Sequence, residues 1–403
     1  MTDTPFAERL LAWYDAEGRH DLPWQQNRSE YRVWLSEVML QQTQVATVIP
    51  YFARFVARFP DFSALAAASI DDVLALWAGL GYYARGRNLH AAAKRIVEDH
   101  GGEMPRDIEA VQALPGVGRS TAAAILAQVH GQRHAILDGN VKRVLARHAA
   151  IDGWPGAAAT AKKLWTISEK YLPLQRLADY TQAIMDLGAT LCAARKPACA
   201  RCPVAEDCAA RRQDRIGDYP ASRPARARAR PLRRANLLLI ENAAGEILIE
   251  RRPPAGIWGG LWCLPIAEEQ ELPETVLYER YALHALRREP LPVLRHAFTH
   301  FELEMTPIRL NATLAEGAVH EHAGRRWINM RTAALPGLPA PVLQFLTRLR
   351  EPPDPCPEPS SASSSALKPK ALTARRSPAS SASASSSRSR SRRGATGSPT
   401  RRA

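Results

Sequence analysis

Residues 114–122 read Leu-Pro-Gly-Val-Gly-Arg-Ser-Thr-Ala, and residues 137–145 read Leu-Asp-Gly-Asn-Val-Lys-Arg-Val-Leu. An alanine-rich stretch of helical character joins the two. The proline and the glycines at 116 and 118 predict a tight hairpin, because glycine permits sharp turns and leaves the backbone N–H groups uncovered. This stretch is the most informative part of the chain, and the remaining motifs are interpreted around it.

A helix is predicted to begin at Ser120 or Thr121, directly after the hairpin. The uncovered amides would then lie at the positive N-terminus of a helix, which favours a bound phosphate. One acid, Asp138, follows beside Gly139, a residue that lets another group approach closely. A phosphate site followed by a single carboxylate suggests chemistry on a nucleic acid. The alternative is that Pro-Gly-x-Gly and Asp-Gly are ordinary turns, so the surrounding sequence must decide.

The composition points to a polyanionic partner. The chain of 403 residues carries a net charge of +14 and has an isoelectric point of about 9.8. Part of this excess lies in arginine-rich runs at 223–234 and after 348, which are typical of solvated linkers. Residues 1–19 have helical spacing with no apolar signal core, and no apolar stretch is long enough to span a bilayer. We therefore expect a soluble, cytoplasmic, nucleoid-associated protein.

The pattern divides the chain into four parts. Residues 1–215 show apolar spacing of three and four, which predicts an all-α domain. Residues 216–233 are rich in proline and arginine and are interpreted as a basic linker. Residues 234–348 mix strand-like and helical runs, which predicts an α+β domain. Residues 349–403 are rich in serine, arginine and proline, with almost no large apolar residue, which predicts a disordered tail.

Four cysteines lie close together at the end of the helical part, in the loop 192–208. They are Cys192, Cys199, Cys202 and Cys208, with the spacing C-x6-C-x2-C-x5-C. In a cytoplasmic chain such a group predicts a metal centre more readily than disulfides. Zinc accepts four sulfurs in a structural site, and so does an iron–sulfur cubane. Zinc sites usually pair two short C-x2-C elements, and the single one here favours iron–sulfur.

A second acid lies among apolar residues. Residues 29–47 are predicted to form one helix with Ser29 as its N-cap, on which Glu37 shares a face with Trp34 and Val38. Burial penalises the charged form of a carboxyl group, so Glu37 could stay protonated near neutral pH and act as a general acid. The alternative is an acid at the helix edge, or one paired with Arg32. Two acids in different surroundings suit cleavage of a glycosidic bond, by protonation of the leaving group and stabilisation of an oxocarbenium-like centre.

Several motifs together resemble the adenine DNA glycosylases of the MutY type, which are helix-hairpin-helix enzymes with a [4Fe–4S] cluster. The resemblance extends over roughly residues 5–345. It is carried, in order, by Trp34-Leu-Ser-Glu-Val-Met-Leu-Gln-Gln-Thr-Gln-Val45, Gly79-Leu-Gly-Tyr-Tyr-Ala-Arg85, the hairpin 114–118, Leu137-Asp-Gly-Asn-Val141 and the four cysteines. It implies base-excision repair, in which adenine opposite 8-oxoguanine or guanine is flipped out of double-stranded DNA and removed. It also implies that the enzyme acts as a monomer.

The resemblance assigns catalytic roles. Glu37 would protonate adenine at N7 and then assist water, and Asp138 would stabilise the cationic sugar. In the relatives that also cut the strand, a lysine occupies the position of Ser120 and attacks the sugar, so serine implies a monofunctional enzyme. Some relatives carry a tyrosine there that helps the chemistry, and the serine leaves that help in doubt. Lys142 is interpreted mainly as a phosphate contact.

The resemblance also assigns contacts with DNA. The amides of Gly116 and Gly118 would hold a phosphate, with help from a monovalent cation in many relatives. Two further pairs of residues have implied roles: Gln42 and Tyr82 would wedge the duplex beside the mispair, and Trp24 and Leu40 would line the adenine pocket. The alternative for Tyr82 and Trp24 is ordinary core packing. The cysteine loop would present Arg195, Lys196 and Arg201 to phosphate.

The second part of the chain resembles the Nudix-like domain of the same family, through the run Arg251–Trp262. A working Nudix hydrolase needs an acidic run around Arg-Glu-x-x-Glu-Glu, which is absent, so we expect a mispair-recognition module. The run His296-Ala-Phe-Thr-His-Phe301 matches the loop that recognises oxidised guanine, with Phe298, Thr299 and His300 at its centre. Thr299 replaces the usual serine and adds a methyl group. The alternative is a plain buried strand.

Three other functions remain as alternatives. A lyase-type repair endonuclease would be trapped on DNA by borohydride. A non-catalytic iron–sulfur protein would bind mispairs and release no base. A nucleotide pyrophosphatase would require the acidic run that the second domain lacks.

Overall fold

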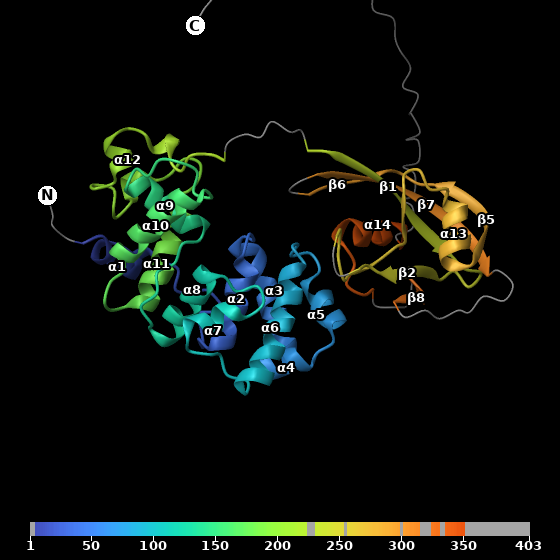
Figure 1. Ribbon diagram of the computed structural model, residues 1–403, viewed down its shortest axis with the longest axis horizontal. Coiled ribbons are helices and arrows are strands. Elements are labelled where there is room, and N and C mark those ends of the chain that lie inside the picture. The colour runs from blue at the N-terminus through green and yellow to red at the C-terminus, as the bar shows by residue number, and fades with distance from the viewer. Residues whose placement is uncertain are drawn as a thin grey trace, which may run out of the picture. The chain divides into compact units, whose positions relative to one another are not determined.

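The computed structural model describes residues 5–223, 230–253, 256–298, 301–314, 324–330 and 335–350. The first part is built of helices, as predicted (Figure 1). In order these are α1 Phe6–Glu17, α2 Glu30–Leu40, α3 Val45–Arg58, α4 Phe62–Ala67, α5 Ile70–Trp77, α6 Ala84–His100, α7 Ile108–Ala113, α8 Arg119–His130, α9 Gly139–His148, α10 Ala158–Tyr171, α11 Leu177–Thr190, the 3-10 turn Cys199–Arg201, α12 Ala209–Arg212 and the 3-10 turn Ile216–Asp218. No described helix is long and apolar enough to cross a membrane.

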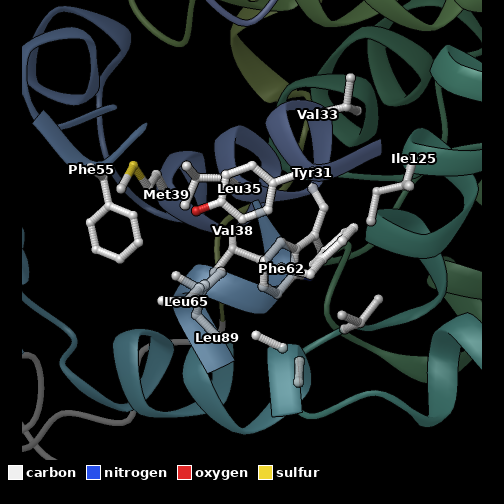
Figure 2. Packing of buried hydrophobic residues seen from close by; sticks show 14 of the residues in the cluster. Tyr31, Val33, Leu35, Val38, Met39, Phe55, Phe62, Leu65, Leu89 and Ile125 are labelled. Atoms are coloured by element: carbon white, nitrogen blue, oxygen red, sulfur yellow. The ribbon is translucent and has the colours of Figure 1, made fainter. Parts of the chain in front are cut away.

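The alanine-rich helix α8 lies between two hydrophobic cores. Its residues Ile125 and Leu126 belong to a core built around α2, and Ala123 and Ala124 belong to a core built from α1, α9 and α11. Figure 2 shows the first core, in which side chains of α2 are surrounded by residues of neighbouring helices. Small side chains let α8 contact α2 on one side and α11 on the other. The hairpin that precedes α8 is held by the first core, to which Leu114 and Val117 belong.

The prediction of one helix over residues 29–47 is wrong beyond Leu40. Ser29 is the N-cap, as expected, and accepts a hydrogen bond from the N–H of Arg32 at 3.2 Å. The helix, however, ends at Leu40 and α3 begins at Val45. The buried guanidinium of Arg85 explains the end, because it donates to the carbonyls of Val38 and Met39 at 3.1 and 2.7 Å. Those carbonyls would otherwise accept from the next turn of the same helix.

The second part of the chain contains an eight-stranded sheet among the residues that the structure describes. Its elements are β1 Leu232–Glu241, β2 Ile247–Arg251, β3 Trp262–Cys263, β4 Ile266–Glu268, α13 Pro273–Tyr281, β5 Leu283–Pro290, β6 Leu294–Ala297, β7 Glu302–Leu314, β8 Arg325–Ile328 and α14 Ala340–Arg350. The main strand order is β3-β2-β1-β7-β5, with β1 and β7 parallel and the other pairs antiparallel. The α+β class predicted for this part is confirmed.

The central strand β1 is buried on both faces. Leu237 and Leu239 pack in the core that contains residues of α14, and Leu238 and Ile240 pack in the core that contains residues of α13. This double burial explains why four consecutive apolar residues form the strand where an alternating pattern would be expected of a sheet with one solvated face. The predicted linker 216–233 overlaps the structure, because β1 already begins at Leu232. The predicted tail lies almost entirely outside the described residues.

Candidate active site

Glu37 lies in the middle of α2, and its carboxyl group is only partly exposed. Its Oε1 accepts a hydrogen bond from the side-chain amide of Gln128 on α8 at 2.9 Å. Burial raises the pKa of Glu37 to about 7, the amide of Gln128 opposes this rise, and the charge of Asp138 adds to it. Arg32, the partner that the alternative interpretation gave to Glu37, donates instead to the carbonyl of Pro23 at 2.8 Å. A carboxyl group with these properties can hold a proton at neutral pH.

Asp138 is the N-cap of α9. Its Oδ1 accepts from the backbone N–H of Val141 at 2.7 Å, which satisfies one of the open amides of the helix start. Burial raises its pKa, and four neighbours oppose the rise: the N–H of Val141, the side chain of Arg143, the N–H of Asn140 and the side chain of Lys142. Since its charge in turn acts on Glu37, the structure brings the two predicted acids close enough to interact.

Helix α8 begins one residue earlier than predicted. Gly118 is its N-cap and Arg119 its first residue, and no side chain caps the helix start. The hydroxyl of Ser120 is directed elsewhere, because it accepts from the backbone N–H of Leu137 at 2.9 Å. Ser120 therefore contacts the residue next to Asp138. This contact could not be foreseen from the sequence, which predicts only that a helix begins at Ser120 or Thr121.

The two glycines of the hairpin differ. Gly116 has φ +78°, and a methyl group there would lie 2.8 Å from the Cβ of Asn88. Gly118 has φ −91°, and a methyl group there would meet nothing within 4 Å. The first glycine is therefore required by the backbone turn and by a neighbour. The second is required by neither, so any need for it must come from a bound group.

The two predicted wedge residues both have strained backbones. Gln42 has φ +59° and Tyr82 has φ +47°, backbone angles that residues other than glycine rarely adopt. Both are exposed, and Tyr82 retains 51% of its accessible surface. Arg85 connects the two segments, because it also donates to the hydroxyl of Thr43 and to the carbonyl of Leu80, at 3.0 and 3.1 Å. Strained, exposed residues held by a buried guanidinium are typical of binding sites.

The other predicted contacts are divided between core and surface. Trp24 is 2% exposed and packs edge-on against Phe52, so in this structure it is part of the hydrophobic core. Leu40, the last residue of α2, is half-buried against the same core. Lys142 is half-buried in the first turn of α9 and acts electrostatically on Asp138.

The four cysteines line one pocket. No group of three or more thiol, imidazole or carboxyl side chains in the described part of the chain is arranged to hold a single metal ion. A zinc ion bonds to sulfur at about 2.3 Å and so brings four sulfurs within roughly 4 Å of one another. A cubane, with one cysteine on each of four irons, accepts donors that face a common space at wider separation. Four cysteine thiols around one pocket are the donor set that an iron–sulfur cubane takes.

Several residues that the sequence did not single out support this pocket. Arg147 is 5% exposed and donates to the sulfur of Cys192 at 3.3 Å and to the carbonyl of Ala193 at 2.8 Å. His148 also lines the pocket and lies 3.1 Å from a carboxyl oxygen of Asp207. Burial raises the pKa of Cys202 to about 11, with a smaller contribution from the neighbouring cysteines.

In the second part of the chain, Phe298 belongs to an aromatic group. Its ring stacks on Phe301 with centroids 4.5 Å apart and meets His296 edge-on at 4.6 Å. Trp258 lies 6.0 Å from Phe298. Phe298 and Phe301 flank Thr299 and His300 in the sequence, and these two predicted site residues lie outside the described residues.

Two family models, several curated proteins and solved structures are similar to this chain. Residues 35–170 match the HhH-GPD superfamily of base excision DNA repair proteins, and residues 236–348 match the NUDIX domain family. The chain is 35% identical over 351 residues to the adenine DNA glycosylase of Buchnera aphidicola subsp. Acyrthosiphon pisum (strain APS), covering 87% of this chain and 99% of that protein. It is 37% identical over 361 residues to the adenine DNA glycosylase of Homo sapiens, covering 74% and 66%. A solved thermostable thymine-DNA glycosylase is similar with a TM-score of 0.48 and 27% identity, covering 52% of this chain and 95% of that one.

Proposed function

The chain belongs to the family of adenine DNA glycosylases, and from this premise we propose that it hydrolyses the N-glycosidic bond of adenine mispaired with 8-oxoguanine or guanine. The observation that carries the proposal is the pair of half-buried acids. Glu37 has a pKa of about 7 and lies within the electrostatic reach of Asp138. One group that holds a proton and one that is surrounded by N–H donors and cations match the two roles in cleavage of a glycosidic bond.

In the proposed reaction the flipped adenine lies between the two carboxyl groups. The protonated Glu37 donates to N7 of adenine, which makes the base a better leaving group. As the bond from nitrogen to C1′ breaks, positive charge develops on the sugar, and the negative charge of Asp138 stabilises it. The ionised Glu37 then accepts a proton from the water that attacks C1′. The products are free adenine and an abasic site.

The proposed enzyme releases the base without cutting the strand. A lyase needs an amine that forms a Schiff base with the sugar, and Ser120 offers a hydroxyl that is already bonded to Leu137. Incubation of the enzyme with borohydride and a mispaired duplex tests this point. We expect only a small trapped fraction, due to Lys142. Covalent trapping of most of the enzyme would favour the lyase alternative.

The four cysteines are proposed to hold a [4Fe–4S] cluster. Hydrolysis moves no electrons, so when bound the cluster would supply structure, by fixing the loop in which Arg195 and Lys196 are exposed. Arg201 is also exposed and pairs with Glu17 at 2.6 Å. Analysis of the purified protein for iron, acid-labile sulfide and zinc tests the assignment, and zinc without sulfide would contradict it. A monovalent cation at the hairpin is a further part of the proposal.

The second domain is proposed to recognise the base opposite adenine, with the aromatic group around Phe298 supporting the loop. A hydrolase role is disfavoured because its acids have arginine partners: Glu271 pairs with Arg280, and Glu274 pairs with Arg288 at 3.3 Å. Release of phosphate from nucleoside triphosphates would revive the pyrophosphatase alternative.

The decisive experiment is single-turnover release of adenine from duplexes with adenine opposite 8-oxoguanine, guanine or thymine. We expect release from the first two duplexes, faster opposite 8-oxoguanine than opposite guanine. We expect Phe298→Ala to lower the rate opposite 8-oxoguanine more than the rate opposite guanine. Equal rates on all three duplexes would contradict the proposed specificity. Binding of the mispaired duplex without release would favour the non-catalytic alternative. The enzyme is proposed to act as a cytoplasmic monomer bound to double-stranded DNA, and light scattering tests the monomer.

A further inference from the structure

Gln128 is the polar member of the buried residues of α8, which are otherwise alanines, an isoleucine and a leucine. It is 4% exposed. An amide in such surroundings is costly unless it is hydrogen-bonded, and its NH₂ group donates to Oε1 of Glu37 at 2.9 Å. The backbone carbonyl of the same residue accepts from Arg28 at 3.3 Å. The position of the amide is therefore fixed at both the side chain and the backbone.

We propose that Gln128 is a positioning residue for the general acid, and that it determines which oxygen of Glu37 carries the proton. The inference rests on the proposed function. A protonated carboxyl group has one carbonyl oxygen, which accepts hydrogen bonds well, and one hydroxyl oxygen, which donates. An amide NH₂ group can only donate. Because it donates to Oε1, Oε1 is the carbonyl oxygen and the proton is held on Oε2, free to be directed at the base.

The other charged groups around α2 do not compete for this oxygen. Arg85 on α6 is bonded to backbone carbonyls at the end of α2. Arg54 and Arg58 on α3 lie over the rings of Tyr51 and Phe59. His130, two residues beyond Gln128 on α8, lies 3.0 Å from Glu30 in the first turn of α2.

The remaining charged neighbour is Asp138 on α9, whose charge favours the protonated form of Glu37. Gln128 acts in the opposite direction, because its donor stabilises the charged carboxylate. The two neighbours therefore set the protonation of Glu37 between them, one from each side of the site.

The test is the pH profile of single-turnover adenine release with Gln128→Met, which keeps the length of the side chain and removes the donor. The rate at low pH should fall roughly 2- to 10-fold, as expected for loss of one hydrogen bond. The pH at which the rate declines should move upward, because the carboxylate loses its donor. Duplex affinity should stay unchanged. Gln128→Glu provides a second variant, whose own carboxyl can donate only at low pH, so it should recover activity only there.

A matched control is Gln112→Met on α7, because that glutamine donates to a backbone carbonyl, at 3.2 Å, and lies outside the site. It should leave the profile unchanged. With the enzyme in saturating excess the rate constant does not depend on the folded fraction, so a destabilised variant still gives an answer. A Gln128→Met profile that matches the wild type would overturn the inference. A wild-type protein that releases no adenine would instead overturn the proposed function.

Discussion

The middle of α2 and the start of α9 each place one half-buried acid in the site, and they surround it differently. Glu37 lies within a helix, where every nearby backbone N–H is already bonded to a carbonyl, so its donor is a single side chain, that of Gln128. Asp138 lies at a helix start, where amides are free to donate, and it has the cations Arg143 and Lys142 as neighbours. Burial raises the pKa of both acids, and only at Asp138 do several N–H groups and cations oppose that rise.

The difference is one of position along a helix and follows from elementary geometry. The pKa of both groups is raised by burial. Several neighbours lower the pKa of Asp138. At Glu37 only the amide of Gln128 lowers the pKa, and the charge of Asp138 opposes it. Four experiments test this difference between the two acids.

The largest expected effect is on the rate of base release. Glu37→Gln removes the proton donor and Asp138→Asn removes the negative charge, while both keep the shape of the side chain. Each should lower the single-turnover rate by a factor of about 100 to 10,000, and duplex affinity should be retained. A wild-type rate in either variant would show that the acid concerned has no part in the chemistry.

The second effect is on the pH dependence of stability. The pKa of Glu37 rises from 4.5 to about 7 on folding. Between these values the folded protein holds more protons than the unfolded chain, so the free energy of unfolding falls as pH rises through this window. Allowing for the partial exposure of the carboxyl, the loss is roughly 1–3 kcal/mol. Urea unfolding at several pH values measures the free energy of unfolding of Glu37→Gln and of the wild type. The variant should become more stable relative to the wild type as pH rises. If the difference between the two free energies does not change with pH, the raised pKa is contradicted.

The third experiment distinguishes the two glycines of the hairpin before α8. Gly116→Ala meets both a left-handed backbone and Asn88, and it should lower the free energy of unfolding by roughly 1–3 kcal/mol. Gly118→Ala meets neither and should cost less, at most about 1 kcal/mol, because Gly118 is the N-cap of α8 and alanine is a poorer N-cap than glycine. If a phosphate lies against the N–H groups of the hairpin, Gly118→Ala should nevertheless weaken duplex binding. Unchanged affinity in that variant would remove the phosphate from the hairpin.

The smallest effect is on the N-cap of α9. Asp138→Asn keeps an oxygen that can accept from Val141, whereas Asp138→Ala does not, so the alanine variant should be less stable by about 1 kcal/mol. Glu37 caps no helix, so the control is the difference in stability between Glu37→Ala and Glu37→Gln, which contains no loss of an N-cap. Equal thermal stability of the two Asp138 variants would mean that the cap is replaced by another group.

Much of the site was predictable because its residues lie in short sequence motifs. The hairpin, the Asp-Gly pair, the cysteine spacing and the apolar face around Glu37 are all visible over short stretches of sequence. The strand pattern was also predictable, since the continuous apolar run Leu237–Ile240 is typical of a strand buried on both faces. The error in α2 has a different origin. Nothing local in Gln41–Gln44 requires a helix to stop, and the end is imposed by Arg85, more than 40 residues away.

By itself the sequence determined which chemical groups are available: two acids, four thiols, a glycine hairpin, and a serine where a lyase would need an amine. It also determined the helical and strand-forming segments, because periodic burial is a local property of the chain. The packing of the helices sets which acid accepts from Gln128, which acid caps a helix, and where α2 ends. The contact from Gln128 to Glu37 spans 91 positions, and such pairings depend on how helices pack across a shared core, which no short stretch of residues encodes.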